Sequence, residues 1–293
     1  MDELSEVIAY ILQAAIIVIA APLVSGIIKR FKARLQNRRG PGVLQVYRDI
    51  FKLLRKDSII SPTSSWLFLY TPFLYFAGAL AGAALTPVLG LGADFFVVLY
   101  VFALGRFFLA LASLDAGSAF GGMGGSREMF ISVLVEPALL LALLTVAFQS
   151  GSTNLTAMAA LVPDTGITLS RIFAMLAFLI VLIAEMGRIP VDNPDTHLEL
   201  TMVHEGMVLE YSGRFLGLII WAASVKQLVF MLLFVLLFFP VTSLGLLEIA
   251  GFVLVTGALA AGIESFTNKM RLFRVPGFLA LSGLLSLLAL VAQ

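Results

Sequence analysis

The chain has 293 residues, of which 60% are hydrophobic and 13% are charged, whereas a soluble domain has roughly 25% charged residues. This composition excludes a soluble globular protein, and at about 20 apolar residues per span the length allows roughly seven to nine transmembrane helices. The chain has no cysteine, which excludes thiolate metal sites and iron–sulfur clusters held by this chain alone. Its formal net charge of +1 gives no indication of a nucleic-acid partner.

Long apolar runs bounded by charge, glycine or proline predict an all-α polytopic membrane protein with about eight spans. The first run is preceded by acidic rather than basic residues, so we expect a retained helix and not a cleaved signal peptide. We interpret residues 1–293 as a single integral membrane domain. The expected spans are 5–28, 66–87, 94–114, 129–149, 169–187, 215–239, 243–263 and 273–291.

The lysines and arginines predict the orientation of the chain in the cell membrane. Ten of the 19 basic residues lie between Lys29 and Lys56, and the others mostly fall in or beside alternate connectors. Because basic loops stay on the cytoplasmic side, we expect loops 29–65, 115–128, 188–214 and 264–274 to be cytoplasmic and both termini to lie outside.

An amphipathic helix is expected directly after the first span. Between Val43 and Lys56 the apolar residues recur at helical spacing, and four basic residues occupy the other face. Such a helix either rests on lipid headgroups or forms a docking surface for a soluble partner, and the sequence leaves both interpretations open.

Four ionisable residues fall inside or at the ends of the predicted spans, where a charge costs a few kcal/mol or more. They are Arg106 in the third span, Glu136 in the fourth, Glu185 near the end of the fifth and Lys226 in the sixth. Any one of them can be half of a static ion pair. Two acids and two bases together favour a hydrated polar track.

A dense acidic segment follows Glu185. Pro190 and Pro194 prevent a regular helix there, so Asp192 and Asp195 are expected on irregular backbone at the cytoplasmic face. Carboxylates in such surroundings can pass protons near neutral pH. The segment continues through Glu199, the two histidines of the chain, His197 and His204, and Glu210. The histidine spacing matches no metal motif, so we predict no metal site.

The glycine-rich segment 115–128 lacks the lysine of a phosphate-binding loop. We expect a tightly packed cytoplasmic turn there, with Arg127 and Glu128 either capping the fourth span or contacting a partner.

Three segments carry a resemblance to a known family. Residues 36–54, which include Arg-Arg-Gly-Pro-Gly, the glycine-rich segment 115–128, and residues 185–213, which include Glu-Met-Gly-Arg-Ile-Pro-Val-Asp-Asn-Pro-Asp-Thr-His, resemble the connector membrane subunit shared by respiratory complex I and the energy-converting membrane-bound nickel-iron hydrogenases. The resemblance covers essentially the whole chain. The first loop lacks the insertion typical of complex I, and Met-Gly follows Glu185, so the chain is more similar to the hydrogenase branch, as in formate hydrogenlyase.

The resemblance implies a non-catalytic subunit that docks a soluble redox arm and couples electron transfer to proton or sodium translocation through buried carboxylates. It implies no cofactor in this chain alone, with a nickel-iron site and iron–sulfur clusters in partner subunits. The partners implied are a nickel-iron hydrogenase-like large subunit, an iron–sulfur small subunit, antiporter-like membrane subunits and the lipid bilayer. The candidate pathway residues are Glu136, Glu185, Asp192, Asp195, Glu199, Glu210, Arg106 and Lys226. The candidate docking residues are Arg38, Arg39, Gly40, Pro41, Arg127 and Arg188.

Three alternatives remain open from the sequence. The first is a quinone-binding connector subunit of a complex I-type NADH dehydrogenase. The second is a stand-alone ion transporter, against which the absence of a visible internal repeat argues. The third is a purely structural membrane anchor, in which Glu136 and Glu185 can be neutralised without loss of coupling.

Overall fold

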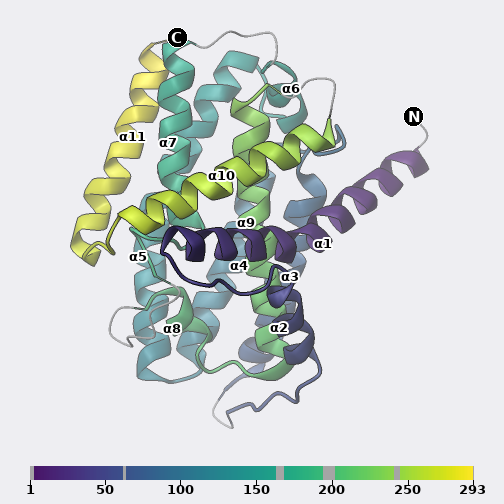
Figure 1. Ribbon diagram of the computed structural model, residues 1–293, viewed down its shortest axis with the longest axis vertical. Helices are drawn as coiled ribbons and strands as arrows, with labels where there is room; N and C mark the ends of the chain where they lie inside the picture. Colours follow the sequence, from purple (N-terminus) through teal and green to yellow (C-terminus); the bar gives the residue numbers. More distant parts are fainter. Residues whose placement is uncertain (1–2, 62–63, 163–167, 194–201, 241–244, 293) are drawn as a thin grey trace.

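The computed structural model describes residues 3–61, 64–162, 168–193, 202–240 and 245–292. Within these residues the chain is a bundle of α-helices without strands (Figure 1). The eight long helices are α1 (Glu3–Leu35), α3 (Trp66–Leu85), α4 (Phe95–Asp115), α5 (Ala119–Ser150), α7 (Leu169–Glu185), α9 (Gly213–Phe238), α10 (Leu246–Phe266) and α11 (Val275–Val291). The shorter elements are α2 (Gln45–Leu54), α6 (Leu155–Ala160), α8 (His204–Val208) and a 3-10 turn at Leu272–Arg274.

The helix lengths confirm an all-α polytopic membrane protein. In the described residues, seven helices are long and apolar enough to cross a membrane. Helix α7 has 17 residues, which is at the lower limit of about 17–25 for a spanning helix. With α7 included, the eight long helices correspond one to one to the eight predicted spans.

Helix α9 forms the centre of the bundle, because nearly all of its second half, from Leu228 to Phe238, is buried. Helices α1 and α10 pack on each other and on α9 and run obliquely across the other helices (Figure 1). Helices α2 and α8 lie at the lower end of the molecule in Figure 1, opposite α6 and the C-terminal end of α11. We refer to the end that carries α2 and α8 as the basic end, since the segment rich in lysine and arginine around α2 lies there.

The predicted amphipathic helix is confirmed as α2, but not all of its apolar residues face the bundle. Val46 and Ile50 face inward, whereas Phe51 is exposed. The Tyr47 hydroxyl donates a hydrogen bond to the Ile19 carbonyl of α1. Helix α2 therefore packs on α1 and α9 as well as lying at the edge of the bundle.

The expected turn at 115–128 is wrong for most of its length, because α5 begins at Ala119. The Ser118 side chain caps this helix by accepting from the Gly121 amide. A Cβ atom on Gly124 would lie 2.8 Å from the Met207 amide nitrogen of α8, so glycine permits close contact between the two helices. Tertiary packing thus overrides the low helix propensity of glycine. Arg127 and Glu128 consequently lie inside α5 and do not cap its start.

Candidate functional site

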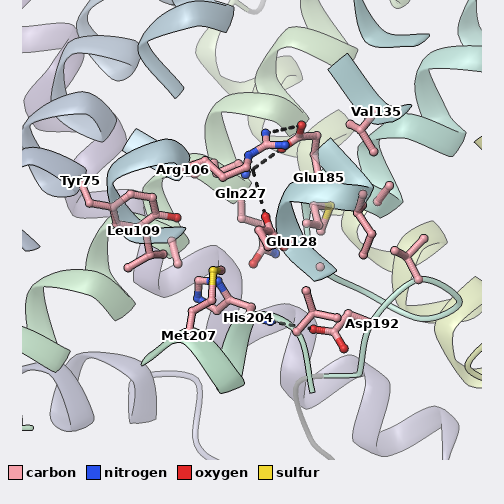
Figure 2. A pocket seen from close by; sticks show the side chains of 18 residues that line it. Tyr75, Arg106, Leu109, Glu128, Val135, Glu185, Asp192, His204, Met207 and Gln227 are labelled. Atoms are coloured by element: carbon pink, nitrogen blue, oxygen red, sulfur yellow. Dashed lines mark hydrogen bonds and ion pairs between the residues drawn. The ribbon is translucent and has the colours of Figure 1, made fainter. Parts of the chain in front are cut away.

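The four ionisable residues predicted inside or at the ends of the spans lie close together in the bundle, and Figure 2 shows Arg106 and Glu185 among them. Glu185 is the last residue of α7, and its side chain is 1% exposed. One of its carboxylate oxygens lies 2.5 Å from an Arg106 nitrogen of α4, and the other lies 2.7 Å from Lys226 Nζ of α9. The structure therefore brings together three charges that are far apart in the sequence.

Helix α5 presents a ladder of polar side chains to Arg106. Glu128, Ser132 and Glu136 recur every four residues and so lie on one face of the helix. The Arg106 guanidinium donates to Ser132 Oγ at 2.8 Å. It lies 3.8 Å from a Glu128 oxygen and 3.9 Å from a Glu136 oxygen. Sequence reasoning did not assign Glu128 to the pathway, although its spacing of eight residues from Glu136 is a signal that could have found it.

We call Arg106, Glu128, Glu136, Glu185 and Lys226 the central cluster. It contains two cations and three carboxylates, so its formal charge is −1. Buried charges of both signs in close contact offset part of each other's desolvation cost. In the described part of the chain, Arg106 Nε is buried without a hydrogen-bond partner. The N–H group of Arg106 Nε is therefore a donor to which a water molecule can bind.

A cavity of about 90 Å³ lies beside the central cluster, which is room for a few water molecules. It extends from Arg106, Glu128 and Glu185 to Asp192 and His204, as Figure 2 shows. Asp192 is buried, accepts a hydrogen bond from the His204 backbone amide at 3.2 Å and lies 2.7 Å from Lys269 Nζ. The cavity thus joins the predicted acidic segment to the charges inside the bundle.

A second opening lies on the other side of the cluster, toward the outer surface of α4 and α5. A cleft of about 390 Å³ is lined by Arg106, Glu136 and Glu185 together with apolar residues. A neighbouring hollow of about 460 Å³ shares Tyr100, Arg106 and Glu136 with it. The Glu136 side chain is 45% exposed. The central cluster consequently lies between an internal polar cavity and a lateral cleft.

The remaining predicted pathway residues are not all part of this arrangement. Asp195 and Glu199 lie outside the described residues. Glu210 is exposed, two residues after the end of α8, and does not line the cavity. Among the described residues, no group of three or more His, Cys, Asp and Glu side chains is arranged to hold a metal ion.

The predicted docking residues fall into two groups. Arg38, Arg39 and Pro41 are exposed on the segment between α1 and α2, where they are available to a partner. Gly40 packs against α1, since a Cβ atom at this position would lie 3.1 Å from Arg30 Cα. Arg127 donates to the Met202 carbonyl at 3.2 Å. Arg188 is buried and pairs with Glu264 at 3.4 Å, so this geometry favours an internal role over the predicted docking role.

Comparisons with known proteins agree with the arrangement of the chain. The family model described as NADH dehydrogenase matches residues 7–291. The chain is 40% identical over 282 residues to formate hydrogenlyase subunit 4 of Escherichia coli, covering 90% of each chain. It is 38% identical to hydrogenase-4 component C of the same organism, over 80% of this chain and 76% of the relative. It is 29% identical to NADH-quinone oxidoreductase subunit 8 of Rhodothermus marinus, over 79% of this chain and 70% of the relative.

A solved structure shares the fold. A chain in the membrane-bound sulfane sulfur reductase, an archaeal respiratory membrane complex, superposes with a TM-score of 0.84 at 17% identity, covering 98% of this chain and 99% of that chain. The predicted resemblance to the connector subunit is confirmed, because the family model matches nearly the whole chain and the hydrogenase-type relatives match at higher identity than the NADH-quinone oxidoreductase relative. The chain therefore belongs to the NADH dehydrogenase family of membrane subunits, on the branch that includes formate hydrogenlyase subunit 4.

Proposed function

We propose that the chain is the membrane connector subunit of an energy-converting, hydrogenase-type respiratory complex. In this role it binds a soluble redox arm at the basic end and couples electron transfer in that arm to ion movement through the membrane. The central cluster is the observation that carries the proposal. Five ionisable side chains among membrane-spanning helices are costly, and here they lie between an internal cavity and a lateral cleft.

The geometry supports a route from the basic end to the outer surface of the bundle. A proton enters near Asp192, crosses the cavity to Glu185 and leaves by Glu136 at the cleft. Protonation of Glu185 weakens its attraction for Arg106 and Lys226, because a neutral carboxyl group has no net charge. Arg106 already lies within 4 Å of Glu128 and Glu136, so it can shift toward them without crossing apolar surroundings.

Electron transfer in the soluble arm supplies the driving force. A change of charge at a redox centre close to the basic end alters the protonation equilibria of nearby carboxylates. The nickel-iron site and iron–sulfur clusters belong to the partner large and small subunits in this proposal. Arg38 and Arg39 form the exposed basic surface that binds this arm.

An antiporter-like membrane subunit covers the cleft between α4 and α5. A half-exposed carboxylate in a spanning helix is unfavourable against lipid, so the surface around Glu136 requires a protein neighbour with a polar group. This places the exit of the pathway at a subunit interface. Both termini lie outside the cell in this orientation.

The test uses the intact complex, purified through a tag on this chain and reconstituted into liposomes. We expect mass spectrometry to identify a nickel-containing large subunit, an iron–sulfur subunit and antiporter-like subunits. In Glu136→Gln, ion translocation per electron pair should fall at least fivefold while electron transfer stays within twofold. Glu6→Gln, a matched change at an exposed glutamate of α1, should leave both rates unchanged.

A structural anchor is the second candidate, because Glu185 with its two cations can also be a static network. This candidate predicts that Glu136→Gln retains full translocation. Co-purification of NADH- or quinone-linked subunits without nickel would instead favour the quinone-binding role.

A further inference from the structure

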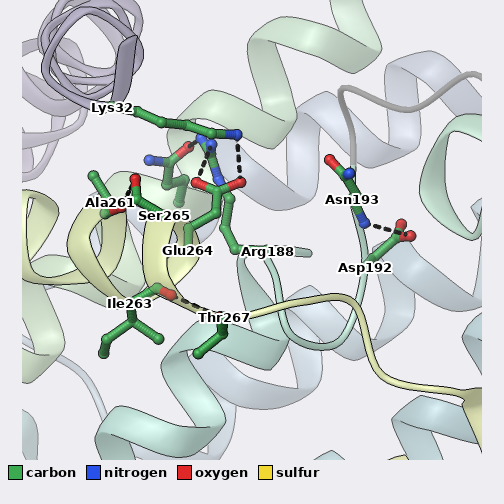
Figure 3. Close-up of polar contacts among 10 residues, drawn as sticks. Lys32, Arg188, Asp192, Asn193, Ala261, Ile263, Glu264, Ser265 and Thr267 are labelled. Atoms are coloured by element: carbon green, nitrogen blue, oxygen red, sulfur yellow. Dashed lines mark hydrogen bonds and ion pairs between the residues drawn. The ribbon is translucent and has the colours of Figure 1, made fainter. Parts of the chain in front are cut away.

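A second buried ion cluster lies outside the proposed route (Figure 3). Lys32 Nζ of α1 lies 2.8 Å from one Glu264 oxygen of α10, and an Arg188 nitrogen lies 3.4 Å from the other. All three residues are buried. We call Lys32, Arg188 and Glu264 the side triad. It contains two cations and one carboxylate, so its formal charge is +1.

The side triad is attached to the turn that carries Asp192. The Arg188 carbonyl accepts hydrogen bonds from the Val191 amide at 2.9 Å and from the Asp192 amide at 3.1 Å. The position of Arg188 therefore sets the position of the Asp192 backbone. Because Glu264 pairs with the side chain of this same Arg188, it is linked to the turn through Arg188.

The segment that follows α10 contacts the same turn at two further points. The Met270 amide donates to the Pro190 carbonyl at 2.8 Å. Lys269 Nζ lies 2.7 Å from an Asp192 oxygen. Glu264, Lys269 and Met270 thus each contact a residue within 188–192. Helix α10 and the segment that follows it therefore hold this turn in place.

The side triad also reaches the wall of the polar cavity. The Arg188 guanidinium lies 3.4 Å from Gln227 Oε1, which also accepts from Ser25 Oγ of α1 at 3.4 Å. Gln227 is adjacent to Lys226 on α9, and both line the cavity with Glu185 and Asp192. A shift of Arg188 therefore changes the wall of the cavity as well as the turn.

If the only role of Glu264 were to join α10 to α1 by an ion pair, Lys32 alone would be a sufficient partner. The second oxygen of Glu264 instead faces Arg188 at 3.4 Å, a distance at which charge attraction contributes more than a close hydrogen bond. Loss of the charge on Glu264 would thus release Arg188, which has long contacts at 3.4 Å to Glu264 and Gln227, while the apolar packing between α1 and α10 remains.

We infer that Glu264 is a positioning residue for ion translocation: it holds Arg188, and through Arg188 it fixes the turn that places Asp192 at the mouth of the polar cavity. This inference rests on the function proposed above. It assigns the oblique helices α1 and α10, which lie across the bundle (Figure 1), a role in setting the geometry of the pathway entrance.

The experiment uses the absence of cysteine from the chain. Asn193→Cys places a single thiol reporter next to Asp192, and modification of this thiol by a maleimide is read on the band of this chain in the intact purified complex. In that background, Glu264→Gln is the test variant, and Glu264→Asp restores the charge. Glu248→Gln is the matched control, since Glu248 lies in the first turn of the same helix, about 24 Å away along its axis.

We expect Glu264→Gln to raise the modification rate of the reporter thiol at least threefold and to lower ions moved per electron pair at least threefold, with electron transfer within twofold. Glu264→Asp should recover at least half of both effects, which a general loss of folding would not allow. Unchanged modification in Glu264→Gln, with or without lost coupling, overturns the inference. Faster modification with unchanged coupling overturns it as well.

A separate variant distinguishes this inference from the proposed function. Asp192→Asn removes the carboxylate itself. If Asp192→Asn retains full coupling, the proposed entrance is refuted regardless of Glu264. If Asp192→Asn loses coupling while Glu264→Gln behaves like the Glu248→Gln control, only the positioning role is refuted.

Discussion

Neutralising Glu185 should destabilise the chain more than removing Glu185 and Lys226 together. In Glu185→Gln, Arg106 and Lys226 remain buried but lose contacts at 2.5 and 2.7 Å to a carboxylate. Breaking a buried pair by removing one partner costs about 3–5 kcal/mol, because an uncompensated charge remains. The double variant Glu185→Gln/Lys226→Met removes one of these cations as well.

The contacts of Arg106 predict the stability of the double variant and of the single Lys226 variant. In the double variant Arg106 keeps Glu128 at 3.8 Å and Glu136 at 3.9 Å, so its charge stays compensated. We therefore expect the double variant to recover about 2 kcal/mol relative to Glu185→Gln, within the range of about 0.5–3 kcal/mol measured for residues in contact. Lys226→Met alone should cost less than Glu185→Gln, because Glu185 keeps Arg106.

The assay is the temperature at which half of the purified complex stays monodisperse in mild detergent. At about 2–4 °C per kcal/mol for chains of this general size, Glu185→Gln should lower this temperature by on the order of 10 °C, and the double variant should recover on the order of 5 °C. Equal losses in both variants would refute the reasoning, because the unpaired charge of Lys226 would then not destabilise Glu185→Gln. Ion translocation should be lost in both variants, which separates the role in the pathway from stability.

Three further predictions concern Glu136, the exposed basic surface at Arg38 and Arg39, and the contact between α5 and α8. Glu136→Asp, which keeps the carboxylate, should retain more than half of the translocation that Glu136→Gln loses; equal loss in vesicle flux assays would contradict a role for the charge. Replacing Arg38 and Arg39 by glutamine should weaken binding of the soluble arm at least tenfold in a salt-dependent way, measured by surface binding at two ionic strengths; unchanged affinity would exclude this surface. Gly124→Ala should destabilise the chain by about 1–3 kcal/mol through overpacking, because the new Cβ lies 2.8 Å from the backbone of α8, and an unchanged melting temperature would contradict the close contact.

The fold was predictable because the membrane imposes a strong constraint on sequence. Spanning helices must be long and apolar, so the eight predicted spans correspond to eight long helices. The central cluster was also partly predictable, since Arg106, Glu185 and Lys226 stand out against apolar neighbours. The sequence could not say that these three residues contact one another, because pairing depends on how α4, α7 and α9 pack.

The errors came from charges and glycines at helix ends. The sequence predicts cytoplasmic loops at Lys32 and Glu264 because both residues border apolar runs, but α1 continues to Leu35 and α10 to Phe266. Lys32 and Glu264 lie 2.8 Å apart, so each charge has a partner inside the bundle that the local sequence does not reveal. The start of α5 was missed for a related reason, since the contact between Gly124 and α8 is a tertiary interaction that local sequence does not contain.

The exposure of the carboxylates argues against a purely static network. The exposed fraction of the side chain is 1% for Glu185, 19% for Glu128 and 45% for Glu136, and Arg106 lies within 4 Å of all three. Arg106 and Lys226 share the buried carboxylate of Glu185, and one further carboxylate would be enough to balance the second cation. The cluster has two, Glu128 and Glu136, which extend it from the buried centre toward the lateral cleft and give it a formal charge of −1 that charge balance does not require. Such a series of acceptors is what we expect if protons pass between the polar cavity and a neighbouring subunit, as proposed above.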